Sequence, residues 1–451
     1  MGYSVKWLHN PESTDTRYLL MSKNRLSENV SRRAFLGRAL MGSAAAMGAV
    51  AFAGGAAGQT ITNSTIENII NSPRRGTWDD QFDARGLRSA VKVSSHVPIL
   101  NPETVIYVES AIAEYRNIVA RGGWPIVPSS SKLSIGDNDP AVSVLRQRLI
   151  ISGDLERSAG TSQAFDTYVD GAVKRFQARH GLPADGVLGR HSYAALNVSA
   201  NIRLGQLETN LIRLRSMSGF LGNRYVVVNI PAAEIEAVEG DRVVQRHTAI
   251  VGKISRQTPI LNSKIHEVIL NPYWTAPRSI IQKDIMPLMR KDPTYLTRNA
   301  IRLFDGSGDE VAPETIDWNA EEAPHLMFRQ DPGKINAMSS TKINFANPHA
   351  VYMHDTPQQS LFGQLLRFES SGCVRVQNVR DLSTWLLRDT NGWDRQTMEQ
   401  VIASGVSTPV LLLEPVPVYF TYISAWSTSD GVVQFRDDIY HRDGVQELAL
   451  Q

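Results

Sequence analysis

The sequence predicts a multidomain α+β protein, because helical periodicity dominates one part of the chain and strand periodicity a later part. At 451 residues the chain is longer than one hydrophobic core usually organises. Apolar residues recur at helical spacing in several segments between residues 101 and 217. From Arg224 onward, runs of Val and Ile follow strand patterning, and a polar, partly helical segment interrupts them. We therefore expect a small helical bundle and a β-rich domain that carries an insertion.

The overall composition is that of an ordinary globular protein. The formal net charge is +2 and 42% of the residues are hydrophobic. There is no basic excess of the kind that binds nucleic acid, so the sequence predicts no nucleic-acid partner.

Residues 1–58 have the pattern of an export signal. Arg32 and Arg33 precede an uncharged stretch, rich in Ala, Gly and Met, at residues 39–58. This arrangement resembles a twin-arginine signal peptide, and Ala51-Phe52-Ala53 offers a small-x-small cleavage site. The alternative is a transmembrane anchor, but the run is short and Gly/Ala-rich for a bilayer span. We expect export to the periplasm, with no stable membrane span after cleavage.

Residues 59–130 read as a linker followed by a helical scaffold segment. The linker is polar and weakly patterned up to about residue 100. Asn101 then offers a helix cap, Pro102 suits the first helical position and Glu103 places an acid in the first turn. The helix is expected to end at Gly122-Gly123.

Residues 131–198 predict a bundle of three short helices joined by turns that contain Gly and Asp. The apolar positions of the three helices are Val142, Leu145 and Leu149; Ala172, Val173 and Phe176; and Tyr193, Ala194 and Leu196. The phrases LSIGDNDPAVSVLRQRL, AVKRFQARHGLPADGVLG and YAALN, in this order, resemble the peptidoglycan-binding domain 1 family. The resemblance implies binding to wall glycan-peptide material without a metal. The competing interpretation is an amphipathic helix with a solvated basic face.

Residues 199–222 predict a connecting helix that packs against the next domain. Leu204, Leu207, Leu211 and Leu214 share one face. The opposite face carries Arg203, Glu208 and Arg213.

Residues 223–443 predict the β-rich domain, and residues 444–451 a tail. Expected strands cover residues 225–230, 243–252, 265–270, 342–345, 350–353, 410–413 and 416–422, and a terminal hairpin covers residues 431–440. A segment at about residues 276–330 lies between strands and turns helical despite Pro287 and Pro293. Insertions of this size are often lids or binding loops. A packing insertion with no role in ligand capture is the alternative.

The one cysteine of the chain, Cys373, follows the small-residue turn Ser370-Ser371-Gly372. A single thiol forms no disulfide within its chain, so its value lies in packing or in reactivity. The small residues give access to the sulfur, and the positive charge of Arg375 together with an imidazole would favour the thiolate. His354, after a strand-like run, is the candidate imidazole, and backbone N–H groups near Gly372 and Cys373 are candidate oxyanion donors.

These residues resemble the L,D-transpeptidase (YkuD) family signature, in which a His precedes a Ser-x-Gly-Cys-[Val/Ile]-Arg box. The wider stretch VYMHDTPQQSLF…SSGCVRV resembles the long, YcbB-type branch, in which an inserted capsule covers the site. The resemblance implies that Cys373 is the nucleophile and His354 the proton donor and acceptor. A backbone carbonyl, rather than Asp355, is then expected to orient the His.

Other site residues complete the expectation. Ser371 and Gly372 are expected at the oxyanion and substrate site, and Arg375 either orients the loop or meets a substrate carboxylate. Tyr352 and Trp274 are either walls of the donor site or core aromatics. No cofactor and no metal are expected, because the histidines show no HExxH or comparable spacing.

The implied reaction is attack on the carbonyl between residue 3 and D-alanine 4 of a peptidoglycan tetrapeptide stem. D-alanine leaves, a thioester remains, and an amine of a second stem resolves it as a 3→3 cross-link. Water as acceptor gives an L,D-carboxypeptidase, and a free D-amino acid gives exchange. The alternative from a different class is a non-catalytic wall-binding scaffold; a serine hydrolase is disfavoured because no G-x-S-x-G elbow is present. Carbapenem β-lactams are expected to acylate Cys373.

Overall fold

The computed structural model describes residues 95–129 and 131–444. The expected export signal, the first part of the linker and residues 445–451 of the expected tail lie outside these ranges. Within the described ranges, no helix combines the length and apolar character needed to cross a membrane.

The scaffold helix α3 (Pro102–Ala120) begins where the capping signal predicts. The side chain of Asn101 accepts a hydrogen bond from the Glu103 N–H at 2.8 Å, which satisfies one of the free donors of the first turn. Val108, Ile112 and Tyr115 are buried on one face, as their spacing predicts.

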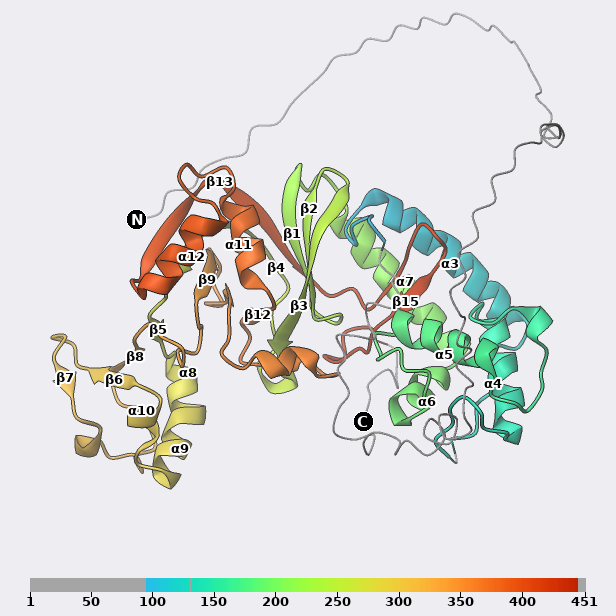
Figure 1. Ribbon diagram of the computed structural model, residues 1–451, viewed down its shortest axis with the longest axis horizontal. Helices are drawn as coiled ribbons and strands as arrows, with labels where there is room; N and C mark the ends of the chain where they lie inside the picture. The colour runs from blue at the N-terminus through green and yellow to red at the C-terminus, as the bar shows by residue number, and fades with distance from the viewer. Residues whose placement is uncertain (1–94, 130, 445–451) are drawn as a thin grey trace, which may run out of the picture. The chain divides into compact units, whose positions relative to one another are not determined.

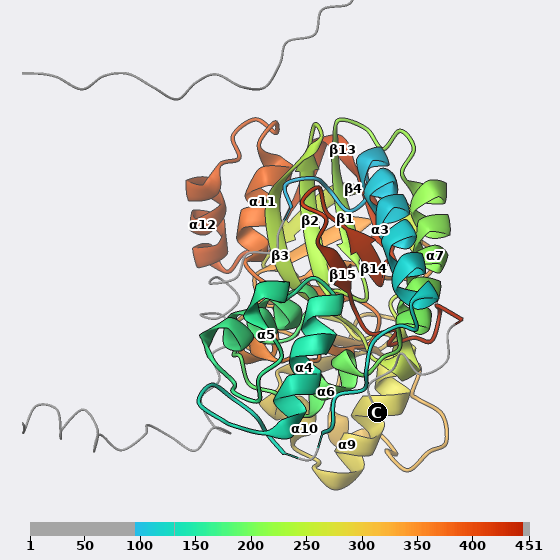
Figure 2. The ribbon, with the colours of Figure 1, turned by 90° about the vertical axis from the view of Figure 1, so that its right-hand side faces the viewer.

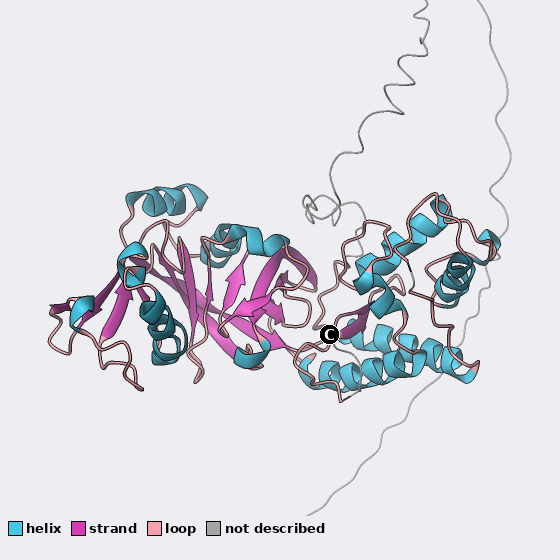
Figure 3. Cartoon of the chain, turned by 90° about the horizontal axis from the view of Figure 1, so that it is seen from below, coloured by secondary structure: helices cyan, strands magenta, loops and turns pink. Residues whose placement is uncertain are grey.

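The expected three-helix bundle is present. It comprises α4 (Pro140–Ile151), α5 (Thr167–Arg179) and α6 (Arg190–Leu196), with a short 3₁₀ turn η1 (Arg157–Ala159) between the first two. Val142, Leu145, Val173 and Phe176 form its own hydrophobic core. Figure 3, coloured by secondary structure, shows one part of the chain that is mainly helical and another that is rich in strands.

The connecting helix α7 (Ala200–Met217) packs along α3. Figure 2 shows the two helices side by side, next to the hairpin of β14 (Ala425–Ser427) and β15 (Val433–Phe435). Arg203, on the face opposite the leucines, is buried, and its guanidinium lies 4.6 Å from the centre of the Phe435 ring. The hairpin therefore covers α7 at this position.

The nine-stranded sheet is built from strands that are distant in sequence (Figure 1). Its order is β11-β3-β12-β10-β9-β4-β13-β1-β2. Strand β2, at one edge, also pairs with β3, so the eight strands from β3 to β2 form a closed ring and β11 pairs outside it. The strands are β1 (Arg224–Asn229), β2 (Glu234–Glu239), β3 (Arg242–Gly252), β4 (Leu261–Leu270), β9 (Thr341–Phe345), β10 (Met353–His354), β11 (Phe368–Ser370), β12 (Val374–Val376) and β13 (Thr408–Thr421). Three 3₁₀ turns lie outside the ladder: η2 (Ile254–Arg256), η4 (Pro313–Thr315) and η5 (Gln359–Gly363).

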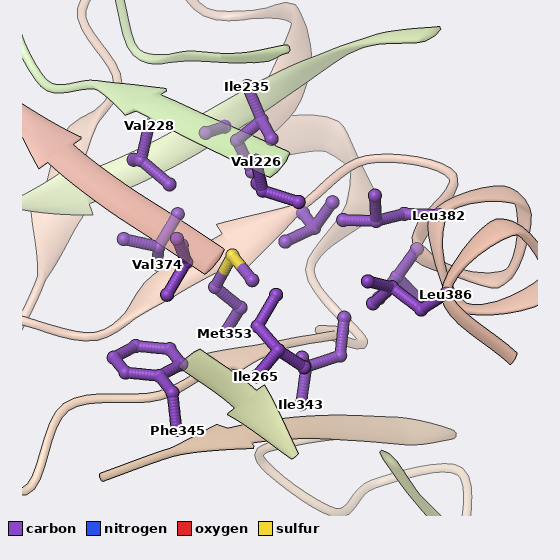
Figure 4. Close-up of a cluster of buried hydrophobic side chains, with 14 of the residues drawn as sticks. Val226, Val228, Ile235, Ile265, Ile343, Phe345, Met353, Val374, Leu382 and Leu386 are labelled. Atoms are coloured by element: carbon purple, nitrogen blue, oxygen red, sulfur yellow. The ribbon is translucent and has the colours of Figure 1, made fainter. Parts of the chain in front are cut away.

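Strand β1 is buried on both faces of the sheet, which explains its continuous apolar run. Val226 and Val228 face a core closed by α11 (Val379–Leu387) and α12 (Arg395–Ser404), as Figure 4 shows for Leu382 and Leu386 of α11. Tyr225 and Val227 face the opposite core, formed with α3, α7 and the hairpin. Alternate residues of a strand point to opposite faces, so each core receives every second side chain.

The insertion has a hydrophobic core and a small sheet of its own. Its helices are α8 (Arg278–Ile280), the π-turn η3 (Ile281–Ile285), α9 (Met286–Lys291) and α10 (Tyr295–Arg298). Its sheet has the order β5-β8-β6-β7, from Trp274–Thr275, Met327–Gln330, Ile301–Phe304 and Glu310–Val311. Pro287 lies within the first two residues of α9, where its missing N–H is tolerated.

Three expected strands differ from those observed. Residues 350–352 are not strand, because the side chain of Asn347 binds Val351 through both its N–H and its carbonyl and folds a turn there. Residues 410–413 and 416–422 form parts of a single strand, β13, which bulges between Leu411 and Val416. The terminal hairpin begins earlier than expected, at β14, and the chain leaves it after Phe435.

Candidate active site

The turn before Cys373 is closed by its own serine. Ser370 Oγ accepts a hydrogen bond from the Gly372 N–H at 3.1 Å and donates one to the Cys373 carbonyl at 2.5 Å. Gly372 has φ +114°, a conformation that side chains strongly disfavour. The Ser-x-Gly-Cys order thus has a local reason: the serine closes the turn and the glycine permits it.

His354 reaches the same place through a strand pairing. Strand β10 runs parallel to β12, with Met353 opposite Val374 and His354 opposite Arg375. The Val374 N–H donates to the Tyr352 carbonyl at 3.1 Å. The register therefore places Cys373, the residue before β12, beside Tyr352. Cys373 and His354 are diagonal neighbours on adjacent strands, although 19 positions separate them in the sequence.

A backbone carbonyl orients the imidazole. His354 Nδ1 lies 2.5 Å from the carbonyl oxygen of Asp355, so Nδ1 carries the proton and Nε2 keeps its lone pair. The carboxylate of Asp355 is occupied elsewhere, accepting hydrogen bonds from Ser340 Oγ at 2.7 Å and the Thr356 N–H at 2.8 Å. Asp355 therefore shapes the turn.

Two aromatic residues and a lysine surround the sulfur. The rings of Tyr352 and His354 are 5.4 Å apart, and Lys342 Nζ lies 4.5 Å from the centre of the Tyr352 ring. The Tyr352 hydroxyl hydrogen-bonds to both Trp274 and Cys373. Trp274 belongs to the first strand of the insertion, so the insertion contributes a side chain to this cluster.

Burial dominates the electrostatics of the Cys–His pair. Loss of hydration raises the pKa of the Cys373 thiol, while hydrogen bonds from Tyr352 and the charges of Lys342 and Arg375 oppose that rise. Burial also lowers the pKa of His354 to about 4, assisted by the charge of Arg375. Positive charge thus acts in the direction expected from the sequence, but burial outweighs it, and the resting pair is a thiol beside a neutral imidazole.

The remaining two expected site residues, Arg375 and Ser371, contact the segments that surround the site. Arg375 donates to Gln358 Oε1 at 2.9 Å, which ties β12 to the loop after His354. Ser371 Oγ accepts a hydrogen bond from Arg256 at 2.9 Å, and Arg256 also forms an ion pair with Asp284 of η3. The turn Ser370-Ser371-Gly372 before the candidate nucleophile Cys373, called the nucleophile turn below, is thereby linked to the insertion.

Sequence reasoning missed Lys342 and Arg256. Neither has a motif of its own: Lys342 faces the site only because β9 pairs with β10 opposite His354, and Arg256 only because the β3–β4 connection passes under the nucleophile turn. A positive charge next to an expected thiol was the available signal, and it was credited to Arg375 alone.

Two hollows among the described residues are not lined by Cys373 or His354. A cavity of about 220 Å³ opens between the bundle and the sheet, with Gly181, Arg246 and Asp437 in its wall. A second hollow lies on the bundle itself, lined by Lys132, Arg190 and Tyr193 among others. Over residues 95–129 and 131–444, no group of three or more His, Cys, Asp or Glu side chains is placed to hold a metal ion.

Comparison with known proteins identifies both domains. Residues 223–411 match the family described as "L,D-transpeptidase catalytic domain" (YkuD), and residues 138–196 match the "Putative peptidoglycan binding domain" family. The chain therefore combines an L,D-transpeptidase catalytic domain with a peptidoglycan-binding domain, and its multidomain α+β class is confirmed.

Among curated proteins, the chain resembles a "Putative L,D-transpeptidase" of Haemophilus influenzae, with 34% identity over 246 residues. The match covers 54% of this chain and 49% of that protein, so the chain spans about half the length of this relative.

Two solved L,D-transpeptidase structures are also similar. The one from Xylanimonas cellulosilytica is 16% identical and covers 65% of this chain and 99% of its own, with a TM-score of 0.20. The one from Mycobacterium smegmatis is 14% identical and covers 44% of this chain and 58% of its own, with a TM-score of 0.22. The family models and the curated relative, rather than these structures, carry the assignment.

Proposed function

We propose that the chain is a cysteine-dependent L,D-transpeptidase that forms 3→3 cross-links in peptidoglycan. The observation that carries this proposal is the parallel pairing of β10 with β12, in which Cys373 lies beside Tyr352, one position back from His354 on the adjacent strand. Among the hydrogen bonds of the described residues, the N–H of Cys373 has no acceptor. A free backbone N–H next to a nucleophile is suited to stabilise an oxyanion.

The first half-reaction begins from the neutral pair. His354 Nε2 takes the proton of Cys373 as the sulfur attacks the carbonyl between residue 3 and D-alanine 4 of a tetrapeptide stem. The C–S bond forms, and the electron pair of the carbonyl moves to its oxygen, which the Cys373 N–H stabilises. The imidazolium then gives its proton to the leaving nitrogen, the C–N bond breaks, and D-alanine departs from a thioester on Cys373.

The second half-reaction reverses the proton movements. The side-chain amine of a second stem attacks the thioester carbonyl, His354 accepts a proton from that amine, and the thiolate leaves and is reprotonated. Water in place of the amine gives an L,D-carboxypeptidase, and a D-amino acid gives exchange. The neighbouring bundle, with its hollow lined by Lys132 and Arg190 among others, favours an acceptor held on the wall.

The site residues fall into the following roles in this proposal. Tyr352 and Lys342 favour the developing thiolate, since both lower the pKa of the thiol. Trp274, bonded to Tyr352, forms a wall of the donor site and links it to the insertion, which acts as its cover. Gly372 and Ser371 form the turn that supports the oxyanion donor, and Arg375 orients the loop through Gln358.

Location and inhibition follow from the same proposal. A wall-acting enzyme must meet its substrate outside the inner membrane, and the twin-arginine pattern at Arg32 and Arg33 supplies the route to the periplasm. Carbapenems present a strained amide carbonyl that the same thiol can attack; the ring C–N bond then breaks and Cys373 is left acylated as a thioester, without a metal or cofactor.

The decisive experiment is intact-mass analysis after incubation with a carbapenem. We expect one adduct on the native protein and none on Cys373→Ala. A native protein without an adduct, or an adduct that survives Cys373→Ala, would overturn the cysteine mechanism and leave the scaffold alternative. Digestion of the products formed from a defined tetrapeptide substrate then distinguishes cross-linked, hydrolysed and exchanged stems.

A further inference from the structure

A tyrosine beyond the matched catalytic region reaches under the nucleophile turn. The L,D-transpeptidase match ends at residue 411, whereas Tyr440 follows the β14–β15 hairpin. The Tyr440 side chain is 5% exposed. Its hydroxyl donates to the Gly252 carbonyl and accepts from the Thr258 N–H at 3.3 Å, so it fastens both ends of the loop between β3 and β4.

The loop held by Tyr440 presents Thr258 to the nucleophile turn. Thr258 is fully buried, and its Oγ1 accepts from the Gly252 N–H at 2.8 Å and donates to the Gly372 carbonyl at 2.9 Å. The loop is closed so tightly that a Cβ on Gly252 would lie 2.2 Å from the Arg256 carbonyl oxygen. One hydroxyl therefore connects a rigid loop to the residue before Cys373.

The direction of the Cys373 N–H follows from this contact. A trans peptide unit is planar, and its C=O and N–H point in opposite directions. Thr258 holds the C=O of the Gly372–Cys373 peptide on the loop side, so the N–H of the same peptide points away from the loop. Among the hydrogen bonds of the described residues, this Cys373 N–H donates to no acceptor, so it is available to a substrate oxygen.

We propose that Thr258, held by Tyr440, is a positioning residue that aims the Cys373 N–H at the substrate carbonyl oxygen. The inference rests on the proposed acyl-transfer function and adds that the oxyanion donor depends on Thr258 and, through it, on Tyr440, which lies outside the matched catalytic region. Thr258 and Tyr440 do not touch the substrate; they act through the Gly372–Cys373 peptide.

The segment that carries Tyr440 is itself anchored to the helical part of the chain. The Tyr440 N–H donates to Tyr422 Oη at 2.8 Å, and Tyr422 donates to Asp438 at 2.7 Å. Arg436 donates to the Arg179 carbonyl of α5 at 3.1 Å, and Asp443 pairs with Arg213 of α7. The support of the nucleophile turn is therefore continuous with the bundle and the connecting helix.

The test compares two reactions of the same thiol in Thr258→Val. Acylation by a carbapenem needs the oxyanion donor, whereas alkylation by iodoacetamide needs only the thiolate. We expect Thr258→Val to lower the acylation rate about 10- to 100-fold, since one oxyanion donor is misdirected. Alkylation should keep its rate and pH midpoint within about twofold, because the thiol environment is unchanged.

Two further variants complete the experiment. Thr258→Ser keeps the hydroxyl and should restore acylation, whereas Tyr440→Phe keeps the ring and Thr258 but should lower acylation selectively. Acylation of Thr258→Val at the wild-type rate, or a parallel fall of acylation and alkylation in both Thr258→Val and Tyr440→Phe, would overturn the inference. Failure of the wild-type protein itself to be acylated would instead overturn the proposed function.

Discussion

His354 and Arg375 lie opposite each other on the parallel strands β10 and β12, so a two-residue strand positions the imidazole beside the nucleophile turn. The same register brings Arg375 close enough to lower the pKa of His354 and to oppose the burial that raises the pKa of Cys373. The arrangement makes the imidazole a proton acceptor at neutral pH, because it is unprotonated before attack.

His354→Ala should abolish acylation while leaving the fold intact. The imidazole is the group placed to accept the thiol proton, and general-base removal typically lowers rates by about 10²- to 10⁴-fold. The measurement is the carbapenem acylation rate together with the far-UV spectrum and the melting temperature. His266→Ala, on the exposed face of β4, is the matched control and should acylate normally. Acylation by His354→Ala at the control rate would contradict the assignment.

The buried imidazole of His354 should make stability depend on pH below neutrality. Its pKa is about 4 in the folded chain, against an ordinary 6.5. Between these values the unfolded chain binds a proton that the folded chain does not, so the free energy of unfolding falls as the pH is lowered from 6.5 to 4. The His354 contribution is about 3 kcal/mol. Denaturant titrations at pH 7 and pH 4.5 give the free energy of unfolding at each pH. The loss of unfolding free energy between pH 7 and pH 4.5 should be larger for the wild type than for His354→Asn; equal losses would exclude this contribution.

Tyr352→Phe should raise the pKa of Cys373. The Tyr352 hydroxyl lowers that pKa through its hydrogen bond to the sulfur, so its removal leaves burial less opposed. At a fixed pH below the midpoint, less thiolate is present and iodoacetamide should react more slowly. A pH–rate profile of alkylation measures the midpoint directly. Tyr273→Phe, a half-exposed neighbour of Trp274 in sequence, serves as control; an unchanged midpoint in Tyr352→Phe would refute the contact.

Gly372→Ala should impair both folding and acylation. A side chain at φ +114° is strained, which costs about 1–3 kcal/mol, and relief of the strain would turn the Cys373 N–H. Chemical unfolding and the acylation rate report the two effects. Gly363→Ala is a suitable control, since a Cβ there meets nothing within 4 Å and its φ is not positive. Wild-type acylation by Gly372→Ala would show that the turn tolerates a side chain.

Asp284→Asn should loosen the insertion with little effect on global stability. The Asp284 carboxylate accepts a hydrogen bond from Arg256 Nη2 at 2.9 Å, and Arg256 also donates a hydrogen bond to Ser371 Oγ. The pair is partly exposed, so its loss should change the free energy of unfolding by about 1 kcal/mol or less. Hydrogen exchange should accelerate in η3 and α9, and Asp309→Asn, exposed in the same insertion, should leave exchange there unchanged. Unaltered exchange in Asp284→Asn would show that the ion pair does not restrain the insertion.

Local patterns were enough to predict the helices and most strands. The Asn101 cap and the acidic first turn of α3 are short-range signals, read within one turn of chain. Strand β2 was missed because its alternation of Glu with Ile, Ala and Val resembles an exposed edge, whereas Glu236 is buried against Arg246. Partners ten residues away along two strands are invisible to a local pattern.

The sequence by itself determined the domain classes and is the basis for proposing Cys373 as nucleophile and His354 as its imidazole, because Ser370-Ser371-Gly372-Cys373 and His354 carry their chemistry in residue type and order. Only the tertiary structure decided what surrounds the sulfur. The charge of Lys342 acts on it from β9, and Trp274 of the insertion interacts with Tyr352 beside it. Thr258 of the β3–β4 loop, held by Tyr440 from beyond the hairpin, binds the carbonyl of Gly372. The physical reason is that burial and strand register, both set by contacts between distant segments, determine the pKa of the thiol and the direction of a backbone N–H.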